Sequence, residues 1–148
     1  YPQIVLAGRR INDGMSSWVV EQMVLEMAKR CLVIGGENVL VLGLTFKENC
    51  PDLRNTRVVD ALEALRGYGM RPQVVDPWVD KDEAKKEYGL SVYSEVPKNV
   101  KYNVILVAVA HEQFKSWTAA YWEKLMKPNC VAMDINGIIP RELSPLRL

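Results

Sequence analysis

Short, nearly continuous apolar segments recur along the chain, and between them apolar residues repeat every three or four positions. A continuous apolar run bounded by turn residues predicts a strand that is buried on both faces. The run at residues 103–110 is the strongest, because nearly every position in it is apolar. The predicted strands are residues 38–42, 71–76, 90–93, 103–110 and 130–134.

The segments between these runs carry the helical pattern of one apolar and one polar face. Gly67 and Gly69 predict the end of one helix, and Gly89 predicts the end of a short, highly charged one. Residues 136–148 contain two prolines and no period, so we expect them to be irregular. The predicted helices are residues 12–34, 55–68, 81–88 and 118–126.

Strands that alternate with helices predict a parallel sheet with helices on both faces, joined by right-handed crossovers. We therefore predict an α/β fold with a doubly wound, Rossmann-like parallel sheet of five strands in the order 3-2-1-4-5, preceded by a long helix. The order reverses between strands 38–42 and 103–110. Ligands of open α/β sheets bind at such a reversal, so we predict a crevice lined by residues 43–54 and 110–112.

The predicted first helix, residues 12–34, carries an apolar stripe that has two interpretations. The pair Asn12-Asp13 can cap its start, and Gly35-Gly36 would end it. Its stripe either packs on the sheet or contacts an upstream domain or a second subunit, and the sequence favours neither. We divide the chain into a connecting helix, residues 1–36, and a sheet domain, residues 37–148.

The composition places the chain among ordinary globular proteins, with 148 residues, 49% apolar and 25% charged. The net charge of +1 gives no basic field, so we expect neither nucleic-acid nor membrane-surface binding. The sequence has no apolar run of about eighteen residues that would span a membrane. It does not begin with Met, and residues 1–6 lack a secretory signal. We expect a piece of a longer protein.

The three cysteines, Cys31, Cys50 and Cys130, are widely spaced and fit neither a disulfide framework nor a zinc site. A reducing cytoplasm and no bound metal are the simplest expectation. Cationic neighbours can lower the pKa of a thiol, but no histidine lies near Cys50 in the sequence, and we interpret it as a packed loop cysteine. Cys31 and Cys130 are predicted to lie in the core.

The turn after the first strand lacks the glycine-rich fingerprint of dinucleotide-binding domains. After Gly43 the chain runs Leu-Thr-Phe-Lys, and these bulky side chains keep the backbone away from a pyrophosphate. Asp76 ends the second strand, where nicotinamide-binding domains place a ribose-binding acid. Without the glycines we interpret Asp76 as a turn residue. Any phosphate must then be held by side-chain cations.

Lys47 and Arg54 are the cations available on this loop, and each has a structural alternative. Lys47 is either a solvated loop lysine or a phosphate ligand. Arg54 is predicted to begin a helix, where a cation opposes the macrodipole unless an anion is near. Asp52 or a ligand phosphate would supply that anion. A planar fork beside a point charge suits a diphosphate.

His111, the only histidine, follows the strongest predicted strand and precedes Glu112. A role as general base is conceivable. We favour a cap for the next helix or a hydrogen bond to a neighbouring loop.

The loop after the first strand also carries a recognisable signature. Residues 43–57 read Gly-Leu-Thr-Phe-Lys-Glu-Asn-Cys-Pro-Asp-Leu-Arg-Asn-Thr-Arg. They resemble the signature G-x-x-F-K-x-x-x-x-D-x-R-x-S/T of the UDP-glucose/GDP-mannose dehydrogenase family. The residues at the variable positions are similar to those of the branch that oxidises UDP-N-acetylhexosamines for bacterial capsule, Vi-antigen or O-antigen synthesis. Two further stretches agree, residues 7–15 (Ala-Gly-Arg-Arg-Ile-Asn-Asp-Gly-Met) and 107–114 (Val-Ala-Val-Ala-His-Glu-Gln-Phe).

The resemblance implies an enzyme of three parts: an NAD-binding domain, a central helical region, and a carboxy-terminal domain that closes over a UDP-sugar. This chain resembles the third part with the helix that leads into it. By resemblance, Phe46 and Lys47 bind the nucleotide-sugar, with Lys47 near its phosphates, and Arg54 reaches NAD on the other domain. The family's nucleophilic cysteine lies in an upstream Gly-Gly-x-Cys segment, so we expect no catalytic residue here. Cys50 does not match it.

Some relatives have an arginine after an Asp-Gly pair near the last strand, and it contacts UDP. Here residues 133–138 read Met-Asp-Ile-Asn-Gly-Ile, without an arginine directly after them. Asn136 and Arg141 are the candidates to replace it.

The resemblance further implies that the parent enzyme oxidises the C6 hydroxyl of a UDP-hexose or UDP-N-acetylhexosamine to a carboxylate. It would use two NAD and pass through an aldehyde held as a thioester, for surface polysaccharide synthesis. The implied partners are the UDP-sugar, the missing amino-terminal and central domains, and a second subunit in a cytoplasmic homodimer. We expect the isolated chain to be inactive.

Two rival interpretations belong to other classes. One is a stand-alone nucleotide-binding or regulatory module without catalytic activity. The other is a flavodoxin- or receiver-like signalling domain, which requires an acidic cluster that Asp76 and Asp134 alone do not make.

Overall fold

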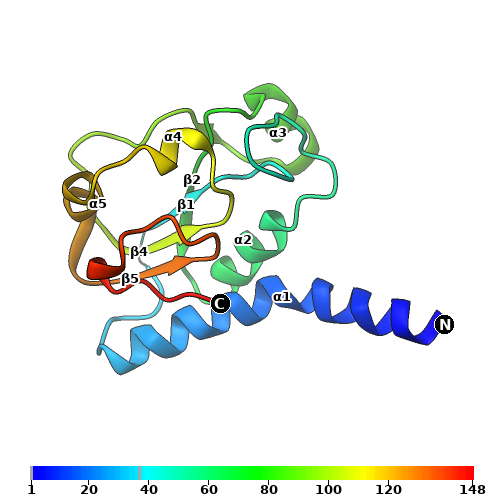
Figure 1. Ribbon diagram of the computed structural model, residues 1–148, viewed down its shortest axis with the longest axis horizontal. Coiled ribbons are helices and arrows are strands. Elements are labelled where there is room, and N and C mark those ends of the chain that lie inside the picture. Colours follow the sequence, from blue (N-terminus) through cyan, green and yellow to red (C-terminus); the bar gives the residue numbers. More distant parts are fainter. Residues whose placement is uncertain (1, 37) are drawn as a thin grey trace.

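The computed structural model describes residues 2–36 and 38–148 and contains a parallel sheet flanked by helices (Figure 1). The strand order β3-β2-β1-β4-β5 confirms the predicted doubly wound topology, with its reversal between β1 and β4. The strands are β1 (Asn38–Leu42), β2 (Arg71–Val75), β3 (Val92–Tyr93), β4 (Tyr102–Val107) and β5 (Met126–Asp134). The helices are α1 (Pro2–Lys29), α2 (Val58–Gly67), α3 (Lys81–Tyr88), α4 (Glu112–Lys115) and α5 (Ala119–Leu125).

The two faces of the sheet are covered by different elements. Val39 and Val41 of β1 belong to a core that includes residues of α1, α2 and α3. Leu40 and Leu42, which point to the opposite face, belong to a second core with Trp122 of α5. Because both faces are buried, the central strands are apolar at successive positions.

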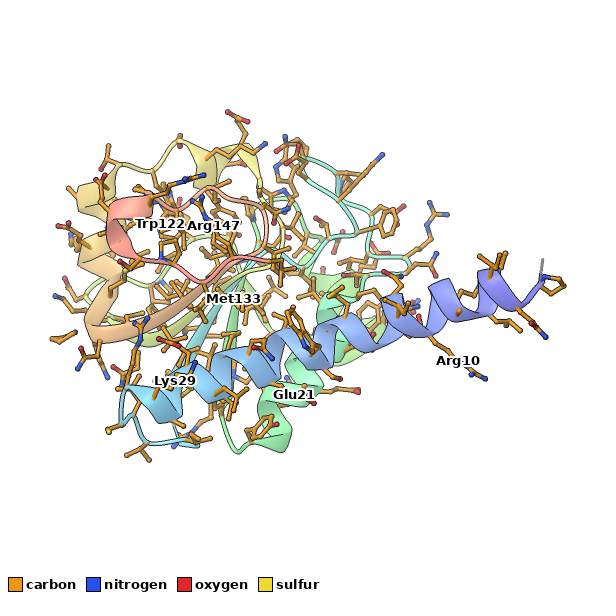
Figure 2. The ribbon with its side chains drawn as sticks, turned by 60° about the horizontal axis from the view of Figure 1, so that its bottom comes forward. Arg10, Glu21, Lys29, Trp122, Met133 and Arg147 are labelled. Carbon is orange, nitrogen blue, oxygen red and sulfur yellow. The ribbon has the colours of Figure 1, made fainter. Side chains whose placement is uncertain are left out.

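The amino-terminal half of α1 stands free of the sheet. The helix begins at Pro2, earlier than the predicted residue 12, and proline suits the first helical turn. Residues 2–15 are all exposed, and Figure 1 shows this half projecting beyond the rest of the domain. In Figure 2 Arg10 lies on the projecting part.

The carboxyl-terminal half of α1 packs against α2 and β5. Its buried side chains are Val19, Val20, Met23 and Met27. One half of the helix therefore fits the interpretation of a helix packed on the sheet, while the other half presents exposed apolar side chains. The division at residues 36 and 37 stays a prediction, and residues 1 and 37 lie outside the described part of the chain.

The end of α1 differs from the prediction that Gly35-Gly36 stops it. The helix ends at Lys29, and Cys31 adopts a left-handed φ of 56°. The amide of Leu32 donates to the Met27 carbonyl at 2.9 Å, which is the bond of a Schellman motif that spans six residues. A non-glycine residue thus provides the stop, which the sequence pattern does not reveal.

Helix α2 begins at Val58, three residues later than predicted. Asn55 has a left-handed φ of 59°, which no helix accommodates. The Thr56 hydroxyl donates to the Leu44 carbonyl at 2.6 Å and so attaches the start of α2 to the loop after β1.

The carboxyl-terminal part of the chain is more ordered than predicted. β5 begins at Met126, earlier than the predicted residue 130. Its register against β4 shifts between Tyr102 and Val104, and Asn129 has a left-handed φ of 63°. The predicted irregular tail contains a 3-10 helix (Arg141–Leu143) and a parallel bridge between Met133 and Leu146. Helix α4 was not predicted either. No helix in the described residues is both long and apolar enough to cross a membrane.

Candidate functional site

The loop after β1 starts with a glycine that the fold requires. Gly43 has a φ of +91°, and a Cβ there would lie 2.4 Å from the Val109 Cβ. Its amide donates to the Val75 carbonyl at 2.9 Å. A side chain at this position would push the loop away from the end of β4, so Gly43 sets the path of everything that follows it.

Asp76, at the end of β2, holds this loop through hydrogen bonds to its backbone. Its Oδ2 accepts hydrogen bonds from the amides of Leu44 (2.7 Å) and Thr45 (3.2 Å). Its Oδ1 accepts from the amides of Trp78 (2.7 Å) and Val79 (3.2 Å). Asp76 is thus the predicted turn residue, and it also fixes a loop more than thirty positions earlier in the chain.

The carboxylate of Asp76 is buried, with a relative exposure of 1%. Burial acts to raise its pKa, but hydrogen bonds from His111 and from the Leu44 amide outweigh burial and lower the pKa below its usual range. The carboxylate is therefore ionised at neutral pH, as its role as a multiple acceptor requires.

His111 joins the end of β4 to the same loop. Its Nε2 lies 2.9 Å from the Asp76 Oδ2 and 3.2 Å from the Thr45 hydroxyl, and its Nδ1 accepts from the Asn49 amide at 2.9 Å. This confirms the interpretation of a histidine that hydrogen-bonds a neighbouring loop. It precedes α4, but its side chain makes no cap bond.

The predicted crevice residues are brought together by these contacts. The Asn49 side-chain oxygen accepts from the Glu112 amide at 2.9 Å, and Lys115 pairs with Glu48 at 2.9 Å. The loop 43–54 and the turn 110–112 therefore lie side by side at the carboxyl ends of β1 and β4.

Phe46 and Lys47 lie at the outer side of this loop. Phe46 is 56% exposed, and Lys47 is exposed next to it. Among the residues that the structure describes, no carboxylate lies within 4.0 Å of the Lys47 ammonium. The Phe46 amide donates to the Asp52 carbonyl at 2.8 Å, which closes the loop behind them. An aromatic ring and an exposed lysine thus lie side by side on the outer side of the loop.

Arg54 has the ion-pair partner that the sequence offered as its structural alternative. Its Nε and Nη2 donate to the two carboxylate oxygens of Asp52, each at 3.0 Å. This fork holds the pKa of Asp52 at about 2. The Arg54 side chain remains 84% exposed, and it lies before α2 rather than at its first turn as predicted.

The cysteines do not form a reactive centre in the described residues. Cys50 is half-buried, and Cys130 is half-buried with a pKa raised to about 12 by burial. Cys31 is exposed, so its predicted place in the core is wrong, because the left-handed turn carries it off the helix face. No group of three or more His, Cys, Asp or Glu side chains in the described part of the chain could hold a metal ion.

The end of β5 presents a cation that the sequence analysis missed. Asn136 and Arg141 are both exposed. Arg147 instead donates to the Ile139 carbonyl at 2.7 Å and lies 3.4 Å from the carboxylate of Asp134. Figure 2 marks Arg147 on the tail segment that bridges to β5. The tail pattern alone gave no signal for this return to the sheet.

A hollow of about 950 Å³ lies between residues 94–101 and the α4–α5 segment. Its lining includes Val96, Trp117 and Tyr121, and none of the predicted site residues Phe46, Lys47 and Arg54. The hollow and the loop after β1 are thus separate places on the surface.

The sequence model of the UDP-glucose/GDP-mannose dehydrogenase family, UDP binding domain, matches residues 40–141. The chain is 45% identical over its whole length to UDP-N-acetyl-D-glucosamine 6-dehydrogenase of Salmonella typhi, and 46% identical to that of Pseudomonas aeruginosa. It spans 35% of the length of each relative.

The fold of the chain is also similar to that of solved structures. The structure of NDP-N-acetyl-D-galactosaminuronic acid dehydrogenase from Methanosarcina mazei Go1 superimposes with a TM-score of 0.82, at 23% identity. The match covers 93% of this chain and 28% of that protein.

Proposed function

The chain belongs to the UDP-glucose/GDP-mannose dehydrogenase family, whose UDP binding domain it matches, and we propose that its loop after β1 grips the diphosphate of a UDP-sugar through Lys47. The branch that the sequence resembled, the UDP-N-acetylhexosamine 6-dehydrogenases, is confirmed by the two bacterial relatives. Phe46 is proposed to contact the same nucleotide-sugar.

The observation that carries this proposal is the position of Lys47. In the described residues no carboxylate lies within 4.0 Å of its ammonium, and the Lys47 charge acts on Asp52 only at longer range. Lys47 stands on a loop that buried groups hold at the point where the strand order reverses. A cation on a fixed loop attracts an anion without a large cost in ordering the loop. Open α/β sheets bind their ligands at this place.

Arg54 is proposed to contact NAD from this side of the active site. The loop after β1 has one glycine followed by Leu44, so it does not fit the close backbone grip that a pyrophosphate needs. Asp52 holds the guanidinium in an exposed position through Nε and Nη2. Its Nη1 makes no hydrogen bond to the residues that the structure describes and can donate to a second anion. When bound, NAD would supply the hydride acceptor for oxidation of the sugar, and we propose that another domain would hold most of the cofactor.

The parent protein is proposed to be an NAD-dependent UDP-sugar 6-dehydrogenase for surface polysaccharide synthesis. This chain's share is to bind and orient the UDP-sugar and to exclude water when the domains close over it. The proposed partners are the amino-terminal and central domains and a second subunit. The three free cysteines are consistent with a cytoplasmic location.

Titration of the chain with UDP, UMP and uridine, followed by amide chemical shifts, tests the diphosphate site. We expect the affinity to fall from UDP to uridine, and the shifts to centre on Phe46 and Lys47. Binding will be weak, because the chain supplies only part of the proposed cleft. Equal affinity for UDP and uridine, or shifts confined to the hollow at residues 94–101, would contradict the proposal.

A further inference from the structure

The turn that presents Phe46 and Lys47 is fixed by His111, a residue that never reaches the surface. His111 is fully buried, with an exposure of 0%, beneath Trp78, whose ring stacks on it at a centroid distance of 6.4 Å. The ring of Phe114 covers it from another side at 5.7 Å. Both of its nitrogens are engaged, so it has no free atom to act on a substrate.

The hydrogen bonds of this imidazole fit one tautomer. The Asn49 amide always donates, so Nδ1 must be the unprotonated nitrogen that accepts from it at 2.9 Å. The single ring proton then sits on Nε2, where the ionised Asp76 accepts it at 2.9 Å. Asp76 thus selects the tautomer that leaves Nδ1 free to hold Asn49.

The Asn49 bond matters because Asn49 closes the turn that carries Lys47. Asn49 has a left-handed φ of 55°, a conformation that few residues other than glycine, asparagine and aspartate adopt. Its amide is held by His111 and its side-chain oxygen by the Glu112 amide. At the other end of the turn, the Thr45 hydroxyl donates to the Lys47 carbonyl at 3.0 Å.

We propose that His111 is a positioning residue for the diphosphate loop. Its Nδ1 holds the Asn49 amide and so keeps the Phe46–Asn49 turn in the shape that presents Lys47, while Asp76 keeps the proton on Nε2. This inference rests on the proposed function of Lys47. It excludes His111 as a general base, because neither nitrogen can reach a substrate proton.

Two substitutions separate the two nitrogens. In His111→Asn the amide oxygen takes the place of Nδ1 and can still accept from Asn49, but the donor to Asp76 is lost. In His111→Gln the amide nitrogen can still donate to Asp76, but nothing replaces Nδ1. His111→Asn loses the bond to the ionised Asp76, which is the stronger of the two because it is charge-assisted. A merely structural role would therefore make His111→Asn the more damaging variant, whereas a positioning role predicts the opposite order for UDP affinity.

The experiment measures the UDP affinity of the 148-residue chain and the hydrogen-exchange rate of the Asn49 amide in both variants. We expect His111→Gln to weaken UDP binding about tenfold and to speed Asn49 exchange, as loss of about one hydrogen bond implies. We expect His111→Asn to lose less than about threefold and to keep the Asn49 amide protected.

Equal losses in the two variants, or no loss in either, would overturn the inference. If His111→Gln does not fold, hydrogen exchange of the wild-type chain still tests the inference. Fast exchange of the Asn49 amide would show that His111 Nδ1 does not hold it. If the wild-type chain binds no UDP while its Asn49 amide exchanges slowly, the bond between His111 and Asn49 is supported and the proposed function of Lys47 is contradicted.

Discussion

The two halves of the loop after β1 are held in different ways. The first half, residues 43–49, is fixed by buried groups from the ends of β2 and β4, through Asp76 and His111. In the second half, residues 50–54, Leu53 is buried and its carbonyl accepts from the Tyr88 hydroxyl at 2.9 Å, while the Arg54 side chain is held by the exposed fork with Asp52. The turn that we assign to the UDP-sugar is therefore anchored to buried groups, whereas the Arg54 side chain that we assign to NAD is held by an exposed ion pair.

This difference suits the two proposed ligands. A diphosphate that must be oriented for chemistry needs a cation that does not move, and buried second contacts provide that rigidity. A cofactor carried by another domain needs a contact that forms and breaks as the domains close, and an exposed arginine can adjust to it.

The largest effect is expected from Asp76→Asn. The amide group cannot accept from all the donors that face the carboxylate, so at least one buried amide loses its partner. We expect the free energy of unfolding to fall by about 2 kcal/mol or more, measured by urea denaturation.

Asp80→Asn is the matched control for this change. Asp80 caps α3 by accepting from the amides of Asp82 and Glu83, and asparagine is an equally good cap. Its unfolding free energy should stay within about 0.5 kcal/mol of wild type. Equal losses at the two positions would show that the first half of the loop is not specially held.

Lowering the pH should also weaken the contacts of Asp76 with the first half of the loop. The pKa of Asp76 is lowered in the folded protein, so its contribution to stability is complete above its unfolded pKa of about 4 and is lost as the pH falls through the folded value. We expect the wild-type free energy of unfolding to decline with falling pH below about 4, and the decline to be shallower in Asp76→Asn. Parallel pH curves for the two proteins would contradict this.

The sequence predicted the second half of the loop better than the first, for a physical reason. The Arg54–Asp52 pair joins neighbours in the chain, so it was among the alternatives. Asp76 lies 32 residues from Leu44, and its role depends on the sheet bringing the strand ends together. The topology came from apolar periodicity, which is spread along each strand. The left-handed turn at Cys31 was missed because Gly35 and Gly36 were expected to end the helix. The turn at Asn55 was missed because residue 55 was predicted to begin a helix.

The smallest effect on the isolated chain is expected from Arg54→Ala. Because the ion pair is exposed, its loss should barely change stability. The pKa of Asp52 should rise from about 2 toward its ordinary value, which an NMR titration of its carboxyl would show. UDP affinity should stay within about twofold of wild type, with Arg66→Ala on α2 as the control.

The proposed contact of Arg54 with NAD needs a separate measurement. In a full-length enzyme that contains this domain, Arg54→Ala should weaken NAD binding. Unchanged NAD affinity there would remove Arg54 from the cofactor site.

The most direct test of the account compares UDP binding by Lys47→Ala and Lys86→Ala, using isothermal titration of the chain. Both variants lose one exposed lysine charge, but Lys86 lies on α3 and not on the loop after β1. We expect Lys47→Ala to raise the Kd for UDP about tenfold, the loss of one charge-assisted hydrogen bond, and Lys86→Ala to change it less than about twofold. An undiminished UDP affinity in Lys47→Ala, or an equal loss in both variants, would contradict the claim that this lysine grips the diphosphate.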